Sequence, residues 1–346
     1  PQKTGKSETE MARELGLQRI IRMASNENAW GPSPLAVKAI QNAAAETHLY
    51  PAGNGAKLRK SLATRFNVSP DEIILGNGST ELIDLIARTY LSPEQNAITA
   101  DQTFPLYWLA VTSVNANCIQ VPTRNHAFDL PRMRDSIDSN TRLLYIANPN
   151  NPTGSMVSRP DLEAFLTNVP GNVVVVLDEA YMDFADPNEF PNGLNYLKRY
   201  PNIIVLRTFS KVYGLAGMRL GYAIACPEII TNLNRVRMPY NTSLMAEAGA
   251  LAALEDQAHV QKCIEFNRQE REFLTRELES RGIRVLPSAG NFLLMLLSNV
   301  DELHKRILTT GVFLRPTAWF GVPNGLRITV GKHDENMAFL DAVDRP

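Results

Sequence analysis

A carboxylate and a lysine follow two apolar runs in the middle of the chain. Asp178 ends the run VVVVLD and Lys211 ends the run IIVLRTFSK, so we expect each to lie at the carboxyl end of a strand. In an open α/β sheet ligands bind at that edge, so both side chains could face one ligand. A lysine there is a candidate for imine chemistry, because desolvation disfavours the ammonium and leaves a nucleophilic amine. The alternative is a solvated lysine at a strand end.

The segment around Lys211 adds anion-binding groups to that amine. The stretch TFSKVYGLAGMRLGY places Ser210 and Arg219 beside Lys211 among several glycines. A hydroxyl and a guanidinium around a lysine suggest that the ligand is a phosphorylated aldehyde. Pyridoxal phosphate is such a molecule, and these residues therefore predict it as the cofactor.

Seven motifs extend this interpretation over nearly the whole chain. They are SNEN, YPAGN, LGNGSTELI, NPNNPTG, LDEAYMDF, TFSKVYGLAGMRLGY and GLRITVG. Their order and spacing resemble those of the histidinol-phosphate aminotransferase family, which consists of fold-type I pyridoxal phosphate enzymes. The combination of NPNNPTG, DEAY and SK is specific, whereas each motif alone is a weak signal. The resemblance implies an α/β fold, with a mostly parallel sheet in a large three-layer domain and a smaller α+β carboxyl-terminal domain.

Composition and charge narrow the class of protein. The chain has 346 residues, of which 44% are hydrophobic and 21% charged, as is typical of a soluble globular protein with room for two domains. A net charge of -1 argues against a general nucleic-acid or anionic-membrane surface. Neither the three cysteines nor the five histidines have the spacing of a metal site. The polar amino-terminal stretch and the lack of an apolar run of membrane length predict a cytoplasmic protein.

Changes in pattern divide the chain into three parts. We expect residues 1–30 to form an amino-terminal arm, residues 31–239 a large cofactor-binding domain, and residues 240–346 a small carboxyl-terminal domain. The alternation of strands and helices ends after GYAIA. Two helical stretches then precede the strand-like segments RVLP, NFLLMLL and LRITVG. The arm is expected to pack against the small domain.

The resemblance assigns roles at the centre of the site. Lys211 would form the imine with the cofactor and then move a proton as base and acid. Asp178 would pair with the ring nitrogen and keep it protonated, so that the ring can accept electrons. Asn151, which precedes PTG, and Tyr181 would hydrogen-bond the ring oxygen. Phe104 would stack on the ring, with core packing as its alternative.

A second group of residues is expected to hold the phosphate. Gly78, Ser79 and Thr80 begin a predicted helix, where free N–H groups and a partial positive charge favour an anion. A glycine turn before a helix is commonly structural, which is the alternative for this motif. Ser210 and Arg219 would complete the phosphate site. Arg219 follows the catalytic lysine by eight positions, the interval at which the resembled motif has its phosphate arginine.

Arginines in the last third of the chain are expected to bind the substrate anion. Arg327 in GLRITVG matches the substrate arginine of the family, and Arg315 in FLRP is a possible second. A guanidinium binds carboxylate and phosphate alike in two-pronged fashion. A structural ion pair is the alternative for Arg315. The arm would cover the site and bring Asn26 and Trp30 to the substrate, with plain packing as the alternative for Trp30.

These assignments lead to a pyridoxal phosphate-dependent aminotransferase with a small-molecule amino donor and a 2-oxoacid acceptor. The resemblance implies the conversion of histidinol phosphate and 2-oxoglutarate to imidazole acetol phosphate and glutamate, a step of histidine biosynthesis. It also implies that Tyr50 reaches the cofactor phosphate of a neighbouring subunit, which predicts a homodimer with shared active sites. An aromatic amino acid aminotransferase and a threonine-phosphate decarboxylase-like enzyme are alternatives with the same fold. A third is a non-catalytic pyridoxal phosphate-binding regulatory domain, for which a DNA-binding segment or a lost lysine would be the signature.

Overall fold

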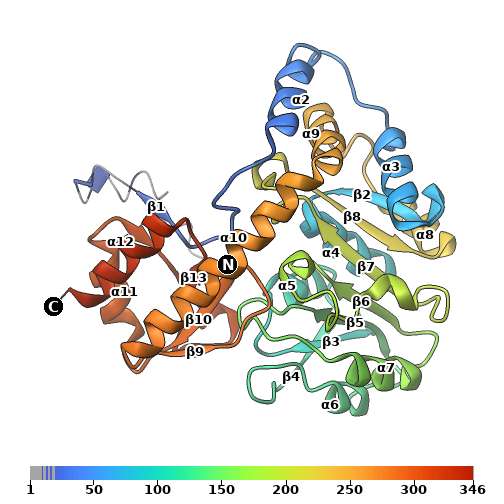
Figure 1. The fold of residues 1–346 in the computed structure, drawn as a ribbon. Helices are drawn as coiled ribbons and strands as arrows, with labels where there is room; N and C mark the ends of the chain where they lie inside the picture. The colour runs from blue at the N-terminus through green and yellow to red at the C-terminus, as the bar shows by residue number, and fades with distance from the viewer. Residues whose placement is uncertain (1–9, 11–12, 15, 18–19, 346) are drawn as a thin grey trace.

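A seven-stranded sheet forms the larger part of the computed structural model, which describes residues 10, 13–14, 16–17 and 20–345 (Figure 1). Strands β7, β6, β5, β3 and β4 run parallel to one another, whereas β8 is antiparallel to both of its neighbours, β2 and β7. This confirms the predicted mostly parallel sheet. In spatial order the strands are β2 (Ile73–Asn77), β8 (Leu220–Ala225), β7 (Ile203–Thr208), β6 (Val174–Asp178), β5 (Thr141–Ala147), β3 (Asn96–Ala100) and β4 (Asn117–Val121).

Helices pack on this sheet and complete a large core. Helix α4 (Gly78–Tyr90) contacts β8, β7 and β5, and α5 (Leu106–Ser113) contacts β3 and β4. Strand β6 is buried along its whole length, as its continuous apolar run predicts for a central parallel strand. The other helices of this part are α2 (Pro34–Ala44), α3 (Ala56–Phe66), α6 (Leu130–Asp135), α7 (Arg159–Asn168), α8 (Pro227–Val236) and α9 (Leu244–Glu255). Short 3-10 turns are η1 (Pro70–Glu72), η2 (Met182–Phe184), η3 (Gly193–Tyr196) and η4 (Ala216–Met218).

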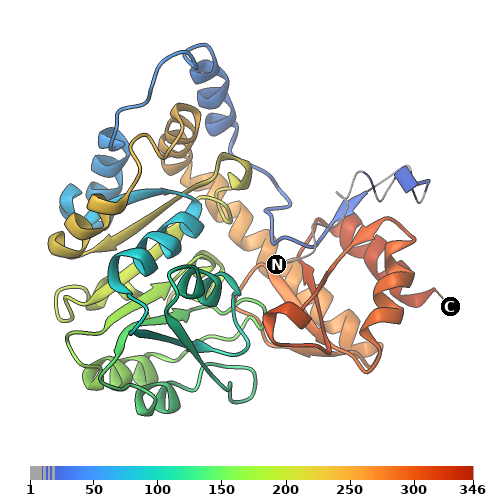
Figure 2. The same cartoon turned by 180° about the vertical axis from the view of Figure 1, so that it is seen from behind.

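A second, smaller unit has its own sheet and its own core. Its four strands are antiparallel to their neighbours, and buried apolar side chains such as Leu293, Ile328 and Phe339 form a separate cluster. Figures 1 and 2 show this unit beside the large sheet, with the long helix α10 running between them. In spatial order the strands are β12 (Arg315–Pro316), β13 (Gly325–Thr329), β10 (Phe292–Leu296) and β9 (Arg284–Leu286). The helical elements are α10 (Gln257–Ser280), α11 (Val300–Leu308), α12 (His333–Asp344) and the 3-10 turn η5 (Ala318–Phe320).

The amino-terminal arm connects the two units. Strand β1 (Ile21–Arg22) pairs in parallel with β11 (Val312–Phe313), and Met23 is buried in the small core. The chain then runs to Ser33, whose side chain caps α2, and α2 packs along α9. Both views show this blue segment passing from the small unit to the large one (Figures 1 and 2). The rest of the predicted arm, residues 1–9, 11–12, 15 and 18–19, lies outside the described residues.

Along α10, buried side chains pass from the large core to the small core, and the domain boundary at residue 239 stays a prediction. Ala250 of α9 and Cys263 in the first half of α10 belong to the large core. Leu274 and Leu278, further along α10, belong to the small core. Helix α10 has 24 residues and is therefore about 36 Å long, which lets one helix serve both cores. Composition marks the end of the βα alternation but not the point where this helix passes from one core to the other.

The carboxyl ends of three parallel strands meet at one edge of the large sheet. Ala147 of β5 pairs with Asp178 of β6, and Asp178 pairs with Leu206 of β7. Asp178 is therefore the last residue of its strand, as predicted. Lys211 is not, because the ladder between β7 and β8 ends at Thr208 and Lys211 lies in the turn beyond it. The apolar Phe209, which is fully buried beneath that turn, makes the sequence read as a longer strand.

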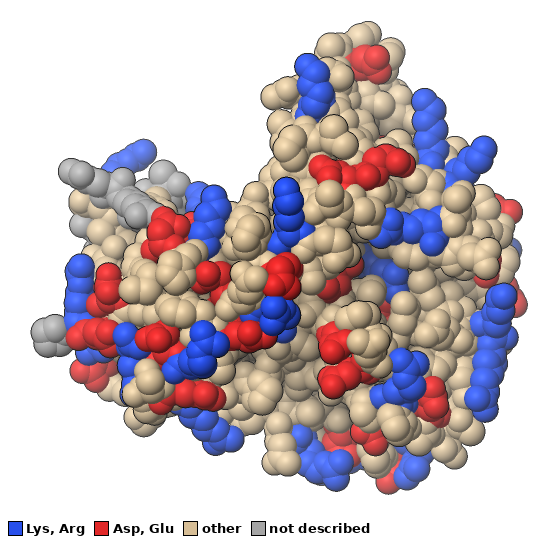
Figure 3. Space-filling model, in the orientation of Figure 1, with Lys and Arg blue, Asp and Glu red and all other residues tan. Residues whose placement is uncertain are grey.

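The outer surface carries both signs of charge. Figure 3 shows lysines and arginines interspersed with aspartates and glutamates over the face in view. Across the described part of the chain, no helix has the length and apolarity needed to cross a bilayer. Within that same part, no group of three or more histidine, cysteine, aspartate or glutamate side chains is placed to hold a metal ion.

Candidate active site

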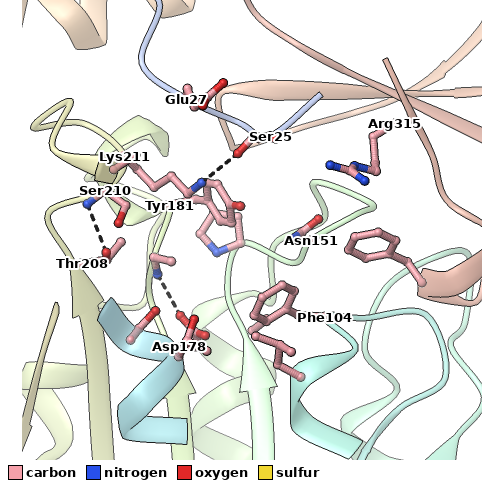
Figure 4. A pocket seen from close by; sticks show the side chains of 18 of the residues that line it. Ser25, Glu27, Phe104, Asn151, Asp178, Tyr181, Thr208, Ser210, Lys211 and Arg315 are labelled. Carbon is pink, nitrogen blue, oxygen red and sulfur yellow. Dashed lines mark hydrogen bonds between the residues drawn. The ribbon is translucent and has the colours of Figure 1, made fainter. Parts of the chain in front are cut away.

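A cavity of about 470 Å³ lies at the carboxyl edge of the large sheet and is lined by both units and the arm. Figure 4 shows Asp178 at its base, Lys211 and Ser210 on one side and Arg315 on the other. Most of the predicted site residues are thus brought together. Those that line the cavity are Ser79, Thr80, Phe104, Asn151, Asp178, Tyr181, Ser210, Lys211, Arg219, Arg315 and Arg327.

Asp178 is a buried carboxylate whose two oxygens each accept one hydrogen bond. The backbone N–H of Ala180 donates to Oδ1 at 3.1 Å, and the hydroxyl of Tyr107 donates to Oδ2 at 2.8 Å. Burial raises the pKa of Asp178, whereas the two hydrogen bonds and the charge of Lys211 act to lower it. A buried carboxylate is stabilised by a cationic partner, and a protonated ring nitrogen would be one.

The arm covers Lys211. Its Nζ donates to the backbone carbonyls of Ser25 and Asn26, each at 3.1 Å, and lies 5.4 Å from the ring centroid of Tyr181 (Figure 4). Carbonyl oxygens satisfy the hydrogen-bonding capacity of the amine but leave it without a neutralising carboxylate at salt-bridge distance among the described residues. The amine therefore faces the cavity without an ionic partner that would compete with a carbonyl ligand.

Donors for an anionic oxygen converge above Asp178. The hydroxyl of Tyr181 accepts from Asn26 Nδ2 at 3.0 Å, and its ring lies edge-on to Phe292 at 5.0 Å. Its own O–H hydrogen remains available to the cavity. The carboxamide oxygen of Asn151 accepts from Arg327, so its Nδ2 can donate into the cavity. Asn26 thus orients Tyr181, although Asn26 itself is not among the residues that line the cavity.

The start of helix α4 forms an anion cradle. Gly78 has a φ of +74°, which favours glycine, and a Cβ at this position would lie 2.4 Å from Nη2 of Arg219, so a side chain here would make the guanidinium shift. The side chain of Asn77 donates to Asn241 O at 3.4 Å instead of capping the helix, which leaves first-turn N–H groups free. Arg219 Nη1 lies 3.5 Å from Ser210 Oγ. Free N–H groups, a hydroxyl and a guanidinium together fit the phosphate of pyridoxal phosphate.

Arg327 is a buried cation on the small-unit side of the cavity. It is 3% exposed, and burial lowers its pKa to about 10. Its Nη2 donates to Ala24 O at 2.8 Å and its Nη1 to Asn151, but its buried Nε has no hydrogen-bond partner within the described part of the chain. Arg315, whose Nε donates to the same carbonyl of Ala24 at 3.3 Å, lies beside it. Two guanidiniums so placed are suited to a ligand anion, because burying a cation is costly without one.

Aromatic side chains form the remaining wall. Phe104 lines the cavity just before α5, and its ring meets that of Tyr107 edge-on at 5.8 Å. From the small unit, Trp319 and Phe320 face the same space. Trp319 also contacts Trp108 of the large unit, with ring centroids 6.4 Å apart. The mouth of the cavity is therefore apolar where the two units approach each other.

Four predicted residues are not among those that line this cavity, namely Gly78, Asn26, Trp30 and Tyr50. Trp30 stacks on Phe266 of α10, with centroids 5.2 Å apart and planes 11° apart, and packs against the large core. This contact fits the packing alternative for Trp30, and its predicted substrate contact stays a prediction. Tyr50 is 80% exposed and lies against Tyr240, with ring centroids 4.7 Å apart, so it does not serve the cavity of its own chain. Its role toward a neighbouring subunit stays a prediction.

The sequence did not single out several residues that the structure places at the site. Thr208 offered a usable signal, because it is the last residue of β7 just as Asp178 is of β6. Tyr107 lies in the first turn of α5, three positions after the predicted Phe104, so its place next to a predicted site residue was a second usable signal. The apolar pattern around the remaining residues gives no such signal. The lining residues that were missed include Ser25, Glu27, Tyr107, Thr208, Trp319 and Phe320.

Comparison with known proteins agrees with this geometry. Residues 18–343 match the family model described as aminotransferase class I and II. The chain is 43% identical to the histidinol-phosphate aminotransferase of Moorella thermoacetica, covering 99% of this chain and 89% of that protein. It is also 43% identical to that of Anaeromyxobacter sp. (strain Fw109-5), covering 100% and 96%. The solved histidinol-phosphate aminotransferase from Sinorhizobium meliloti, in complex with pyridoxal 5'-phosphate, superposes with a TM-score of 0.91 at 28% identity, covering 99% and 94%.

The fold and the cavity define a fold-type I pyridoxal phosphate enzyme. A match over nearly the full length, together with close relatives over the same span, shows the family. The chain belongs to the class I and II aminotransferases. Its cofactor is pyridoxal phosphate, which the anion cradle at α4 and the buried carboxylate of Asp178 fit.

Proposed function

We propose that this chain transfers the amino group of histidinol phosphate to 2-oxoglutarate, giving imidazole acetol phosphate and glutamate. The observation that carries the proposal is the pair of cationic sites in one cavity. Ser210, which lies 3.5 Å from Arg219, is on the same side as Lys211, and Arg315 lies on the other side, paired with Arg327 on the adjacent strand (Figure 4). One site suits the cofactor phosphate, which leaves the second for a substrate that is itself anionic. The names of the full-length relatives support histidinol phosphate as that substrate.

The residues around the cavity divide the work of transamination. Bound pyridoxal phosphate supplies a reactive aldehyde and an electron-accepting ring. Lys211 provides the nucleophilic amine and then holds and moves a proton at Nζ as general base and acid. Asp178 keeps a proton on the ring nitrogen through its carboxylate. Asn151 and Tyr181 donate to the ring oxygen, and the arm positions the Lys211 amine through two backbone carbonyls.

A single half-reaction distinguishes this proposal from its alternatives. Candidate amines are added one at a time to the purified, cofactor-loaded protein, and the change in cofactor absorbance reports amino transfer. We expect histidinol phosphate to react with a higher kcat/KM than phenylalanine or tyrosine. Faster reaction with the aromatic amino acids would replace the proposal with the aromatic aminotransferase. Carbon dioxide released from threonine phosphate would favour the decarboxylase, and no reaction with any amine would favour the regulatory domain.

Arg327→Lys tests how the substrate anion is held. Lysine keeps the charge but loses the planar two-pronged contact, so kcat/KM should fall for histidinol phosphate and for glutamate by about 1.5–3 kcal/mol each, the scale of a hydrogen bond to a charged group. Histidinol, which lacks the phosphate, should lose much less. Arg315→Lys is the matched variant on the neighbouring strand. A loss confined to glutamate in the Arg327 variant, with histidinol phosphate affected only in the Arg315 variant, would assign the phosphate to Arg315.

We further propose that the active form is a homodimer with shared sites. Exposed apolar side chains gather on α2, on the segment that follows it and on the loop after α8, and Tyr50 is among them. A second copy of the chain would cover this surface and bring Tyr50 to the cofactor phosphate of its partner. The residues are Leu35, Val37, Leu49, Tyr50, Met238 and Tyr240. A cytoplasmic location also stays a prediction.

Mixed dimers test the role of Tyr50. If Tyr50 acts across the interface, a hybrid of one Tyr50→Phe chain and one Lys211→Ala chain has one site with both lesions and one with neither. Activity should therefore rise above that of either variant alone, provided that Tyr50→Phe by itself is impaired. Chains with different affinity tags confirm that subunits have exchanged. Mixing Lys211→Ala with the double variant is the control and should give no recovery. Absence of recovery in the confirmed hybrid would place Tyr50 within its own chain or outside the reaction.

A further inference from the structure

The hydroxyl of Tyr107 is the only side-chain donor to Asp178 among residues 20–345. Tyr107 is 1% exposed, and its 2.8 Å hydrogen bond to Oδ2 joins two buried side chains from α5 and β6. The other oxygen, Oδ1, accepts from the backbone of Ala180 at 3.1 Å (Figure 4). With one donor on each oxygen, the plane of the carboxylate is fixed. The remaining lone pairs of Asp178 are then left for a group in the cavity, which Asp178 lines.

The ring of Tyr107 is held so that its hydroxyl has little freedom. It stacks on Tyr145, with centroids 4.9 Å apart and planes 12° apart, and meets Phe104 edge-on at 5.8 Å. Tyr145 is fully buried, and its own hydroxyl donates to the backbone oxygen of Ile83 at 3.0 Å. The stack therefore presents the Tyr107 hydroxyl to Asp178 before any ligand arrives, which is the condition for a preorganised contact.

The charges around the pair fix the direction of this hydrogen bond. Burial and the neighbouring charge of Asp178 raise the pKa of Tyr107 well above its usual range, so the tyrosine stays a donor. Burial raises the pKa of Asp178, and the Tyr107 hydrogen bond is the first interaction that opposes this effect. Removing the hydroxyl would leave one oxygen of a buried carboxylate without its partner, which favours the protonated form.

We infer that Tyr107 is a positioning residue, which orients the carboxylate of Asp178 toward the ring nitrogen of pyridoxal phosphate. The inference rests on the proposed role of Asp178. The hydroxyl of Tyr107 acts through that carboxylate, because it is engaged with Oδ2. Its loss therefore changes how the ring nitrogen is held, whereas the anion cradle at α4 is unaffected.

Tyr107→Phe tests this inference, with Tyr145→Phe as the matched control. Both variants remove one buried hydroxyl from the same aromatic stack, but only the first hydroxyl faces Asp178. The measurements are the dissociation constant of pyridoxal phosphate and the 15N NMR shift of its labelled ring nitrogen in the full-length protein. We expect Tyr107→Phe to raise the dissociation constant about 10-fold or more and to move the nitrogen signal toward the unprotonated form. Tyr145→Phe should leave both close to those of the unmodified protein, even where it lowers Tm.

A double-mutant cycle with Asp178→Asn separates positioning from packing. If Tyr107 acts through the carboxylate, adding Tyr107→Phe to Asp178→Asn should change the nitrogen signal no further. The inference would be overturned if the nitrogen signal were unchanged in the single Tyr107→Phe variant. It would also be overturned if Tyr107→Phe shifted the signal by the same amount in the Asp178→Asn background as in the unmodified protein. Equal effects of Tyr107→Phe and Tyr145→Phe on every readout would reduce Tyr107 to a packing residue. If instead the unmodified protein failed to bind pyridoxal phosphate with a protonated ring nitrogen, the proposed role of Asp178 itself would fail.

Discussion

Replacing Lys211 with alanine is expected to lower multiple-turnover activity by several orders of magnitude. The side chain supplies both the covalent attachment of the cofactor and the proton transfer, and the loss of a covalent catalyst is not compensated by its neighbours. Folding should be largely unaffected, because Nζ makes its two hydrogen bonds to backbone carbonyls of the arm only. Turnover with saturating substrates and borohydride trapping of the protein–cofactor bond are the two measurements.

Lys211→Arg is the matched variant for this prediction. Arginine keeps a cation at the same place but stays protonated, so it can neither attack a carbonyl nor accept a proton. It should therefore be as inactive as alanine, which separates nucleophilicity from charge. Cofactor should still bind to both variants through the cradle of Arg219 and α4. Near-normal turnover in either variant, or a trapped bond in the alanine variant, would show that another residue is the anchor.

The central strands of the large sheet could be predicted from the sequence, because strands that are buried on both faces appear as continuous apolar runs. A run such as VVVVLD, apolar at every position before its final aspartate, suits a strand covered on both faces, and β6 is such a strand. The same logic placed Asp178 at the ligand edge without any knowledge of its neighbours. It failed for Lys211 by three residues, since Phe209 continues the apolar run while packing beneath a turn. A run of apolar residues indicates which positions are buried, but it does not indicate where the hydrogen bonding between two strands ends.

Contacts between distant segments were beyond what the sequence could predict. The arm covers Lys211 through the carbonyls of Ser25 and Asn26, and backbone groups carry no sequence signal. The hydrogen bond from Tyr107 to Asp178 joins residues 71 positions apart and depends on how α5 sits on the sheet. The packing of Trp30 is a further example, because Phe266, which stacks on its ring, lies on α10 more than 200 positions later in the chain.

The substrate end of the cavity depends on both units, and only part of that arrangement could be predicted. Arg327 stood out as a lone cation within an apolar strand, but its burial beside Asn151 follows from how the small sheet packs on the large one. Trp319 had no distinguishing pattern, yet it meets Trp108 across the two units. Specificity is therefore expected to respond to changes in the packing of the units as well as to changes in the cavity itself.

Replacing Asp178 with asparagine is expected to reduce turnover severely while leaving the fold and the phosphate contacts intact. A neutral amide cannot hold a proton on the ring nitrogen, so the ring accepts electrons less well. The test is the rate at which the substrate α-proton is removed in a single turnover, which is measured by rapid mixing. Asp183→Asn is the control, because Asp183 is a carboxylate of the same motif whose pKa burial also raises, but it does not line the cavity.

In the cofactor-free protein, the same substitution should change how the Tm depends on pH. Burial raises the pKa of Asp178 in the folded protein above its unfolded value of about 3.9. Its contribution to folding is therefore fully present below that unfolded value and is lost as the pH rises through the folded pKa. Asp178→Asn has no such titration, so the Tm of its cofactor-free form should fall less between acidic and neutral pH than that of the unmodified protein. The single-turnover experiment decides the role of Asp178 in the reaction. If Asp178→Asn removes the α-proton at a normal rate but binds the cofactor much more weakly, Asp178 serves binding only. If both the rate and the affinity are unchanged, Asp178 does not pair with the ring nitrogen.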